Sequence, residues 1–115
     1  MKKLLSGLII AFPFFTFSQN FNGVWTDSSS TDFSNCTAVF SVKKDSVFMT
    51  HYLEFKGNPF VEYGAGIVNG NQIQYTVYVT VQVPGWNSKK GYHILTVSED
   101  GKTLRGTYED DSGNK

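Results

Sequence analysis

Residues 73–83 alternate between apolar and polar side chains at every second position, and this pattern constrains the fold more than any other feature. One face of the segment carries Ile, Tyr and four Val residues, whereas the other carries Gln, Thr and Tyr. A period of two places successive side chains on opposite faces of a strand. One buried face and one solvated face is typical of antiparallel sheets, because strands in parallel sheets are apolar on both faces. The segment therefore predicts a half-buried antiparallel strand.

Six further segments alternate in the same way and are predicted to be strands. They are residues 20–26, 36–42, 46–55, 60–68, 92–98 and 103–108. Short turn signals separate them, including Asn69-Gly70 and Asp100-Gly101, which predict type I′ hairpin turns whose two central residues both have positive φ. Consecutive strands joined by short turns pair as neighbours. The predicted fold is all-β, an antiparallel up-and-down meander of about seven strands.

The predicted links fall into two groups when they are sorted by the end of the sheet at which they lie. The links at one end are short, covering residues 43–45, 69–71 and 99–102. The other end carries the long links 27–35 and 84–91 and the intermediate link 56–59 around Gly57-Asn58-Pro59. This asymmetry favours a cup-shaped barrel with a closed base and an open mouth, although uneven loops also occur in β-sandwiches.

Seven strands leave an unpaired edge on each side of the sheet, and such edges invite aggregation. Residues 109–115 have the composition of a hairpin turn, and no return strand follows them. An eighth strand would pair the seventh with the first and close the barrel. We therefore expect eight strands in the complete protein and a sequence truncated at its C-terminus. The alternatives are a polar tail or an edge completed by a partner chain.

Residues 1–18 have the three parts of a secretion signal peptide. Lys2 and Lys3 precede an apolar run over residues 4–17, and Ser18 ends the run before the polar Gln19. The run is shorter than the roughly 20 residues that span a bilayer. Gly7 and Pro13 argue against a buried N-terminal helix. The sequence thus predicts cleavage after Ser18, a single domain over residues 19–115, a secreted or periplasmic location and no stable membrane insertion afterwards.

Charge and cysteine content exclude several classes of function. Cleavage would remove two of the ten Lys and Arg residues, which leaves eight against ten acidic residues and a net charge of −2. No basic patch of the size that nucleic acids require remains, so no nucleic-acid partner is expected. The single cysteine, Cys36, cannot form an intrachain disulfide. We expect a buried thiol on a strand, with an intermolecular bridge as the alternative.

A short motif suggests a family. Gly23-Val24-Trp25 lies on the first predicted strand, and Gly106-Thr107-Tyr108 repeats the pattern near the end with Tyr in place of Trp. With the meander order and the loop asymmetry, the chain resembles the small secreted lipocalin-like (calycin-type) β-barrel proteins. The resemblance implies a barrel that encloses a small apolar or amphipathic ligand, with Trp25 plugging the base. The chain departs from true lipocalins in its shorter length and in lacking their C-terminal helix and further motifs.

The residues that bear chemistry are few. His51, His93 and Cys36 are soft metal ligands by type, but no metal-binding spacing relates them, and hydrogen-bonded strand histidines are the preferred interpretation. Glu54 and Glu62 lie on adjacent strands and are interpreted as solvated, outward-facing residues, with an acid–base pair as the alternative. No catalytic motif is present, so the sequence predicts no catalytic residue, no metal and no cofactor.

Ligand-binding residues are predicted from the inward strand faces and from the mouth of the barrel. Met49, His51, Tyr75 and Val77 would line the lumen. The mouth would carry Phe33 and Trp86, because both lie in or beside the long links and aromatic side chains supply large contact areas. Trp86 follows Pro84-Gly85 and either grips a ligand or partner or folds back as a lid over the barrel end.

Three functions are compatible with this pattern. We expect a non-enzymatic binding module for a small hydrophobic or amphipathic ligand, a function that an open cavity would favour. A protein-interaction module, for example a protease inhibitor or a surface-assembly component, would act through the mouth loops, and a lumen filled by Phe and Tyr would favour it. An enzyme that uses His51 or His93 as acid–base ranks third. A histidine paired with a carboxylate inside the barrel would favour the enzyme.

Overall fold

The structure is a computed structural model that describes residues 21–27 and 31–115. The predicted signal peptide, residues 1–18, lies outside the described residues, so its cleavage stays a prediction. Within the described ranges, no helix is long and apolar enough to cross a membrane.

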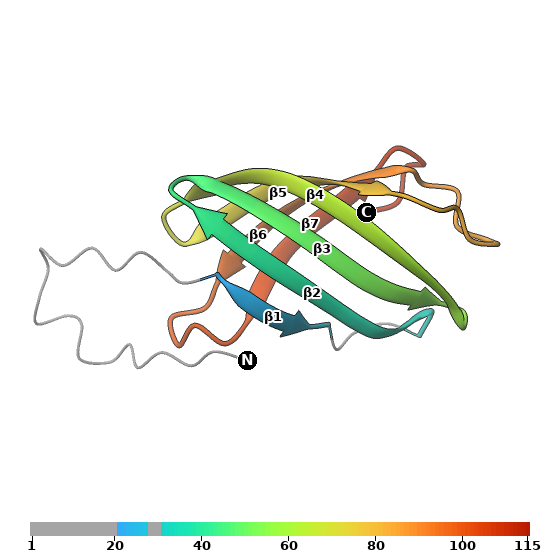
Figure 1. Ribbon diagram of the computed structural model, residues 1–115, viewed down its shortest axis with the longest axis horizontal. Coiled ribbons are helices and arrows are strands. Elements are labelled where there is room, and N and C mark those ends of the chain that lie inside the picture. The colour runs from blue at the N-terminus through green and yellow to red at the C-terminus, as the bar shows by residue number, and fades with distance from the viewer. Residues whose placement is uncertain (1–20, 28–30) are drawn as a thin grey trace, which may run out of the picture.

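Seven antiparallel strands in sequential order form one curled sheet, an up-and-down half-barrel in which β1 and β7 are the two edges. The strands are β1 (Gly23–Thr26), β2 (Phe33–Lys43), β3 (Ser46–Phe55), β4 (Asn58–Asn69), β5 (Gln72–Val79), β6 (Lys90–Val97) and β7 (Leu104–Asp110). The sheet bends so that β2, β3 and β4 lie in front of β6 and β7 (Figure 1). The predicted all-β meander of seven strands is confirmed. An eighth strand stays a prediction.

Two strand boundaries differ from the predicted ones for identifiable reasons. The alternation of residues 73–83 continues past the end of β5 at Val79, but the chain leaves the sheet there, and the side chain of Val81 is 66% exposed. Strand β2 begins earlier than predicted, at Phe33, which pairs with Phe55. The pairing shifts between Ser34 and Thr37, where Asn35 takes a φ of 51°. This irregularity is a β-bulge, which bends a strand without ending its pairing.

One tight turn is of type I′, but it lies at a dipeptide other than those predicted. Lys56-Gly57 connects β3 to β4 with φ values of 49° and 83°, and two positive values identify a type I′ turn. In the β4–β5 turn, Asn69 still pairs with Gln72, and of the two residues between them only Gly70 has a positive φ, 62°. The predicted type I′ turn at Asn69-Gly70 is therefore wrong. A positive φ at the first central position alone is the type II′ pattern.

The concave face of the sheet holds two apolar clusters. The larger one lies toward the end with the short turns. Its buried members are Phe21, Trp25, Ala38, Phe40, Val47, Met49, Ile73, Tyr75, Val77 and Val97. The smaller cluster lies toward the end with the long links and consists of Cys36, Leu53, Phe55, Phe60 and Val83, with Phe33, Val79 and Trp86 packed against it. The predicted asymmetry of the two ends is thus matched by two separate layers of core.

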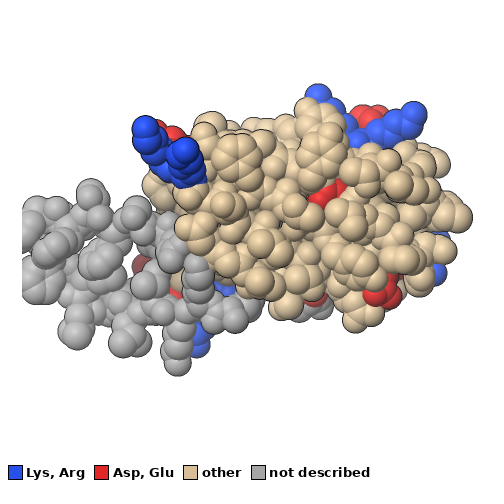
Figure 2. Space-filling view, viewed as in Figure 1, with Lys and Arg blue, Asp and Glu red and all other residues tan. Residues whose placement is uncertain are grey.

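The convex face of the sheet exposes many apolar side chains and few charged ones. Figure 2 shows the face over β2, β3 and β4, on which charged side chains gather mainly at the ends. Its large exposed side chains include Val39, Phe48, Tyr52, Tyr63 and Ile67. Tyr63 and Tyr78 are register partners, and their rings lie 5.8 Å apart. The structure is hollowed on the opposite, concave face.

Candidate functional site

A cavity of about 500 Å³ opens on the concave face between the two edges of the half-barrel. Its apolar lining consists of Trp25, Ala38, Phe40, Tyr75, Leu95 and Leu104. These residues come from β1, β2, β5, β6 and β7, so the curl of the whole sheet brings them together. Ligand pockets in proteins are typically clefts of roughly 300–1,000 Å³ with apolar walls and a few polar groups. The cavity has the size and the composition of such a site.

The aromatic wall of the cavity is held in place by packing and by a hydrogen bond. Trp25 is buried, and its Nε1 donates a hydrogen bond of 2.9 Å to the backbone oxygen of Phe21. Phe40 meets Tyr75 edge to face at 5.5 Å between ring centroids. Burial strongly raises the pKa of Tyr75, so its hydroxyl stays neutral at physiological pH. Trp25 belongs to the cluster nearer the short turns, where the sequence placed it, and it also lines the cavity.

His51 is one of the polar residues that line the cavity. It lies on β3 directly opposite Glu62 on β4, and its Nδ1 is 2.9 Å from Glu62 Oε1. Both side chains are largely buried, with exposed fractions of 12% for His51 and 10% for Glu62. With its proton on Nδ1, the imidazole donates this hydrogen bond to the carboxylate, and Nε2 is the hydrogen-bond acceptor of that tautomer.

The position of Glu62 contradicts the prediction that its side chain is solvated, and its bond to His51 supports the interpretation of that histidine. The sequence analysis interpreted Glu62 as solvated, but it is 8% exposed and faces inward. It does not pair with Glu54, which instead accepts hydrogen bonds from Asn35 and from the hydroxyl of Tyr52. The preferred interpretation of His51 as a hydrogen-bonded strand histidine is confirmed. A signal for the pairing was present: a two-residue turn at Lys56-Gly57 fixes the register that sets His51 opposite Glu62.

His93 lies deeper in the same wall. Its ring stacks on Tyr75 at 4.8 Å with an interplanar angle of 11°, and Tyr108 contacts it at 4.8 Å on β7. Burial lowers the pKa of His93 to about 4, and this effect outweighs the opposing influence of Glu62. His93 is therefore a neutral, stacked element of the wall at physiological pH, whereas His51 is the histidine with a carboxylate partner.

The predicted ligand-binding residues separate into three places. His51 and Tyr75 line the cavity. Met49 and Val77 are buried in the core cluster and are not part of the cavity lining. Phe33 and Trp86 lie at the other end of the sheet, where their rings meet edge to face at 5.2 Å and both pack on Phe55. The long links thus bury much of these two aromatic surfaces against each other, in the lid-like arrangement.

Cys36 lies within the cluster that Phe33 and Trp86 cover. The thiol is free, and the residue is buried on β2, as predicted. Burial raises its pKa, and the carboxylate of Asp27 adds to that effect. A thiol with a raised pKa has little thiolate character and is unreactive. The position therefore serves packing, not chemistry.

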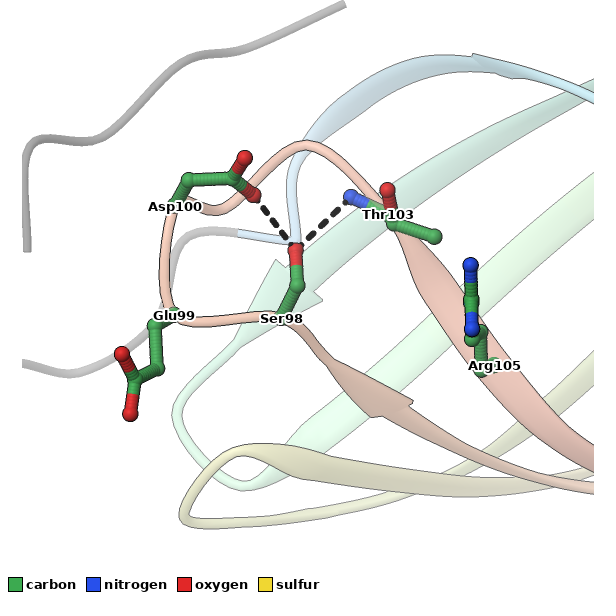
Figure 3. Close-up of a pocket in the computed structure, with 5 residues that line it drawn as sticks. All are labelled: Ser98, Glu99, Asp100, Thr103 and Arg105. Atoms are coloured by element: carbon green, nitrogen blue, oxygen red, sulfur yellow. Dashed lines mark hydrogen bonds between the residues drawn. The ribbon is translucent and has the colours of Figure 1, made fainter.

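A second, shallow depression lies at the β6–β7 turn (Figure 3). Ser98 Oγ donates a hydrogen bond of 2.6 Å to Asp100 Oδ1 and accepts one of 3.1 Å from the backbone nitrogen of Thr103. The bond from Ser98, together with one from the backbone nitrogen of Lys102, lowers the pKa of Asp100. Arg105 lies on β7, apart from these hydrogen bonds (Figure 3). The polar groups of the depression are thus engaged in shaping the turn.

Metal chemistry finds no support in the part of the chain that the structure describes. Within it, no group of three or more His, Cys, Asp or Glu side chains is arranged to hold a metal ion.

No protein-family model matches the chain, and neither the curated proteins nor the solved structures contain a significant match. The functional argument therefore rests on the geometry of the cavity.

Proposed function

We propose that this protein is a binding module that holds a small amphipathic ligand in the cavity on its concave face. The observation that carries the proposal is a cavity of about 500 Å³ that six apolar side chains line together with His51, whose ring is held by the buried Glu62. Apolar walls supply affinity through the removal of apolar surface from water. A buried polar group in the wall supplies orientation, because leaving it unpaired under a bound ligand costs free energy.

The polar group defines part of the ligand. In the tautomer that donates from Nδ1 to Glu62, His51 offers Nε2 as an acceptor, so a ligand with a hydroxyl or amide N–H group beside an apolar body is the best match. Lys102, Arg105 and Asp27 also line the cavity and favour a ligand whose far end is polar. The secreted location expected from residues 1–18 is compatible with a carrier or scavenger of such molecules.

A pair of matched substitutions tests this proposal. Ala38 lines the cavity and Ala65 is exposed on the convex face, so Ala38→Leu fills the cavity and Ala65→Leu adds the same volume outside it. The probe is anilinonaphthalene sulfonate, an apolar dye with one anionic group, titrated by fluorescence. We expect binding with one site per chain that Ala38→Leu weakens at least tenfold and Ala65→Leu leaves unchanged. Equal affinity in both variants would contradict the proposal.

The same pair of residues supports a second candidate function, acid–base catalysis on a bound ligand. A histidine oriented by a carboxylate is a common general base, and His51 has such a partner inside a cavity. Hydrolysis of small chromogenic esters provides the assay. Catalysis requires that His51→Gln abolish turnover while dye binding persists. Turnover that survives in His51→Gln, or none in the unmodified protein, favours the binding module.

A further inference from the structure

The outward side of strands β2, β3 and β4, the β2–β4 face, is a broad apolar surface. The three strands are paired neighbours that lie together in front of β6 and β7 (Figure 1). Six large apolar side chains of this face are 38% to 53% exposed. They are Val39, Phe48, Tyr52, Val61, Tyr63 and Ile67. Because soluble monomers rarely expose contiguous apolar patches larger than a few hundred Å², a surface of this kind marks an interaction site.

The exposed area of the β2–β4 face is large enough for a dimer. Phenylalanine and tyrosine side chains carry about 150–250 Å² each, so the exposed parts of the three rings on this face amount to roughly 300 Å². With the aliphatic side chains and the small residues between them, the face offers roughly 600 Å² per copy and about 1,200 Å² per pair, where the range of specific interfaces begins. The area therefore admits a second copy of this chain as the partner.

The charges of the β2–β4 face favour that partner. Lys43 and Glu54 are the only charged residues at the outward positions of these three strands. Lys43 ends β2 at the β2–β3 turn, whereas Glu54 lies at the opposite end of β3. The carboxylate of Glu54 is held in place by hydrogen bonds from Asn35 and from the hydroxyl of Tyr52. With one cation at one end and one anion at the other, the face is complementary to a copy of itself turned end to end.

We propose that the β2–β4 face packs against the same face of a second copy of this chain, across a two-fold axis that crosses β3 at Thr50. Thr50 lies midway between Ser46, the register partner of Lys43, and Glu54. An axis perpendicular to β3 at this point therefore sets each Lys43 beside Glu54 of the other copy. An axis along β3 would instead bring the two Glu54 carboxylates together, and like charges oppose association.

The arrangement follows the general geometry of packed sheets. Two sheets lie about 10 Å apart face to face, with their strands aligned to within about 30°. The contact is isologous, so it closes at two copies and does not grow into a fibre. Both cavities stay accessible in the dimer, because each lies on the concave face, away from the contact.

Charge reversal and its repair test the pairing by analytical ultracentrifugation. The unmodified protein is expected to sediment as a dimer at about 100 μM and to dissociate on dilution, because an interface of this area lies at the low end of specific ones. Lys43→Glu places like charges together at both ends of the contact and is expected to raise the dissociation constant roughly tenfold or more. The double variant Lys43→Glu/Glu54→Lys restores the dimer. Lys89→Glu, the same charge change at an exposed residue outside the face, leaves it unaltered.

A cross-link tests the direction of the axis independently. Thr50 and Ser46 are both exposed on the outward side of β3. Thr50→Cys places two thiols across the axis, so a short bismaleimide is expected to join the two copies. Ser46→Cys stays uncoupled, because the axis carries Ser46 to the far end of the partner strand, and the unmodified protein measures the background from the buried Cys36. A monomer at the same concentration, a dimer indifferent to Lys43→Glu, or coupling of Ser46→Cys in place of Thr50→Cys would each overturn the proposal.

Discussion

Replacement of Glu62 by Leu is expected to lower the free energy of unfolding by about 2 kcal/mol. Removing one partner of a buried hydrogen bond leaves the other unsatisfied, at a cost of about 1–3 kcal/mol. Fully enclosed ion pairs lose about 3–5 kcal/mol when one partner is removed. His51 and Glu62 are each about a tenth exposed and His51 borders an open cavity, so the lower range applies.

A double-mutant cycle separates the interaction itself from general effects of the substitutions. Chemical unfolding in urea, followed by tryptophan fluorescence, gives the free energy for the unmodified protein, His51→Leu, Glu62→Leu and the double variant. The decrease in the free energy of unfolding of the double variant is expected to be smaller than the sum of the decreases in the two single variants, by at least about 1 kcal/mol. In a domain of this size, 2 kcal/mol corresponds to a decrease in melting temperature of about 10 °C. Losses that add to within about 0.5 kcal/mol would refute a direct interaction.

Three further results are expected. The pKa of His93 is about 4 in the folded state and near 6.5 in the unfolded state, so the unfolded state binds the proton first as the pH falls. The free energy of unfolding therefore falls by up to about 3 kcal/mol from pH 6.5 to pH 4. Urea unfolding at several pH values measures this profile, and His93→Phe is expected to flatten it. Gly66→Ala drives a Cβ into the backbone oxygen of Gln74, so it destabilises by at least about 2 kcal/mol. Gly70→Ala, strained only by its φ of 62°, costs about 1 kcal/mol in the same assay. Cys36 is buried, so a thiol reagent such as dithionitrobenzoate labels it only after denaturation, and rapid labelling of the native protein would contradict its placement.

Local patterning predicted the architecture because each strand carries its own period-two signal. The inward residues Ile73, Tyr75 and Val77 are buried, as the alternation requires. Strand β5 nevertheless ends before Val81, because alternation records which side chains prefer burial and not whether a neighbouring strand remains within reach.

The site was harder to predict because it depends on register and on contacts distant in sequence. His51 faces Glu62 only when the turn at Lys56-Gly57 is assigned as the two-residue type, which sets the pairing of every residue after it. The contact of Phe33 with Trp86 joins the start of β2 to the long link between β5 and β6, whose conformation leaves no periodic signal. Composition also misplaced Glu62, since glutamate is rarely buried unless it is paired.

Native mass spectrometry of the protein, purified from its own host, tests the central claim most directly. The account predicts a small amphipathic molecule bound at one copy per chain, retained by Ala65→Leu and lost from Ala38→Leu, because only the second substitution fills the cavity. A bare protein mass in the unmodified chain, or a molecule retained equally by both variants, would contradict the assignment of the concave face as the binding site.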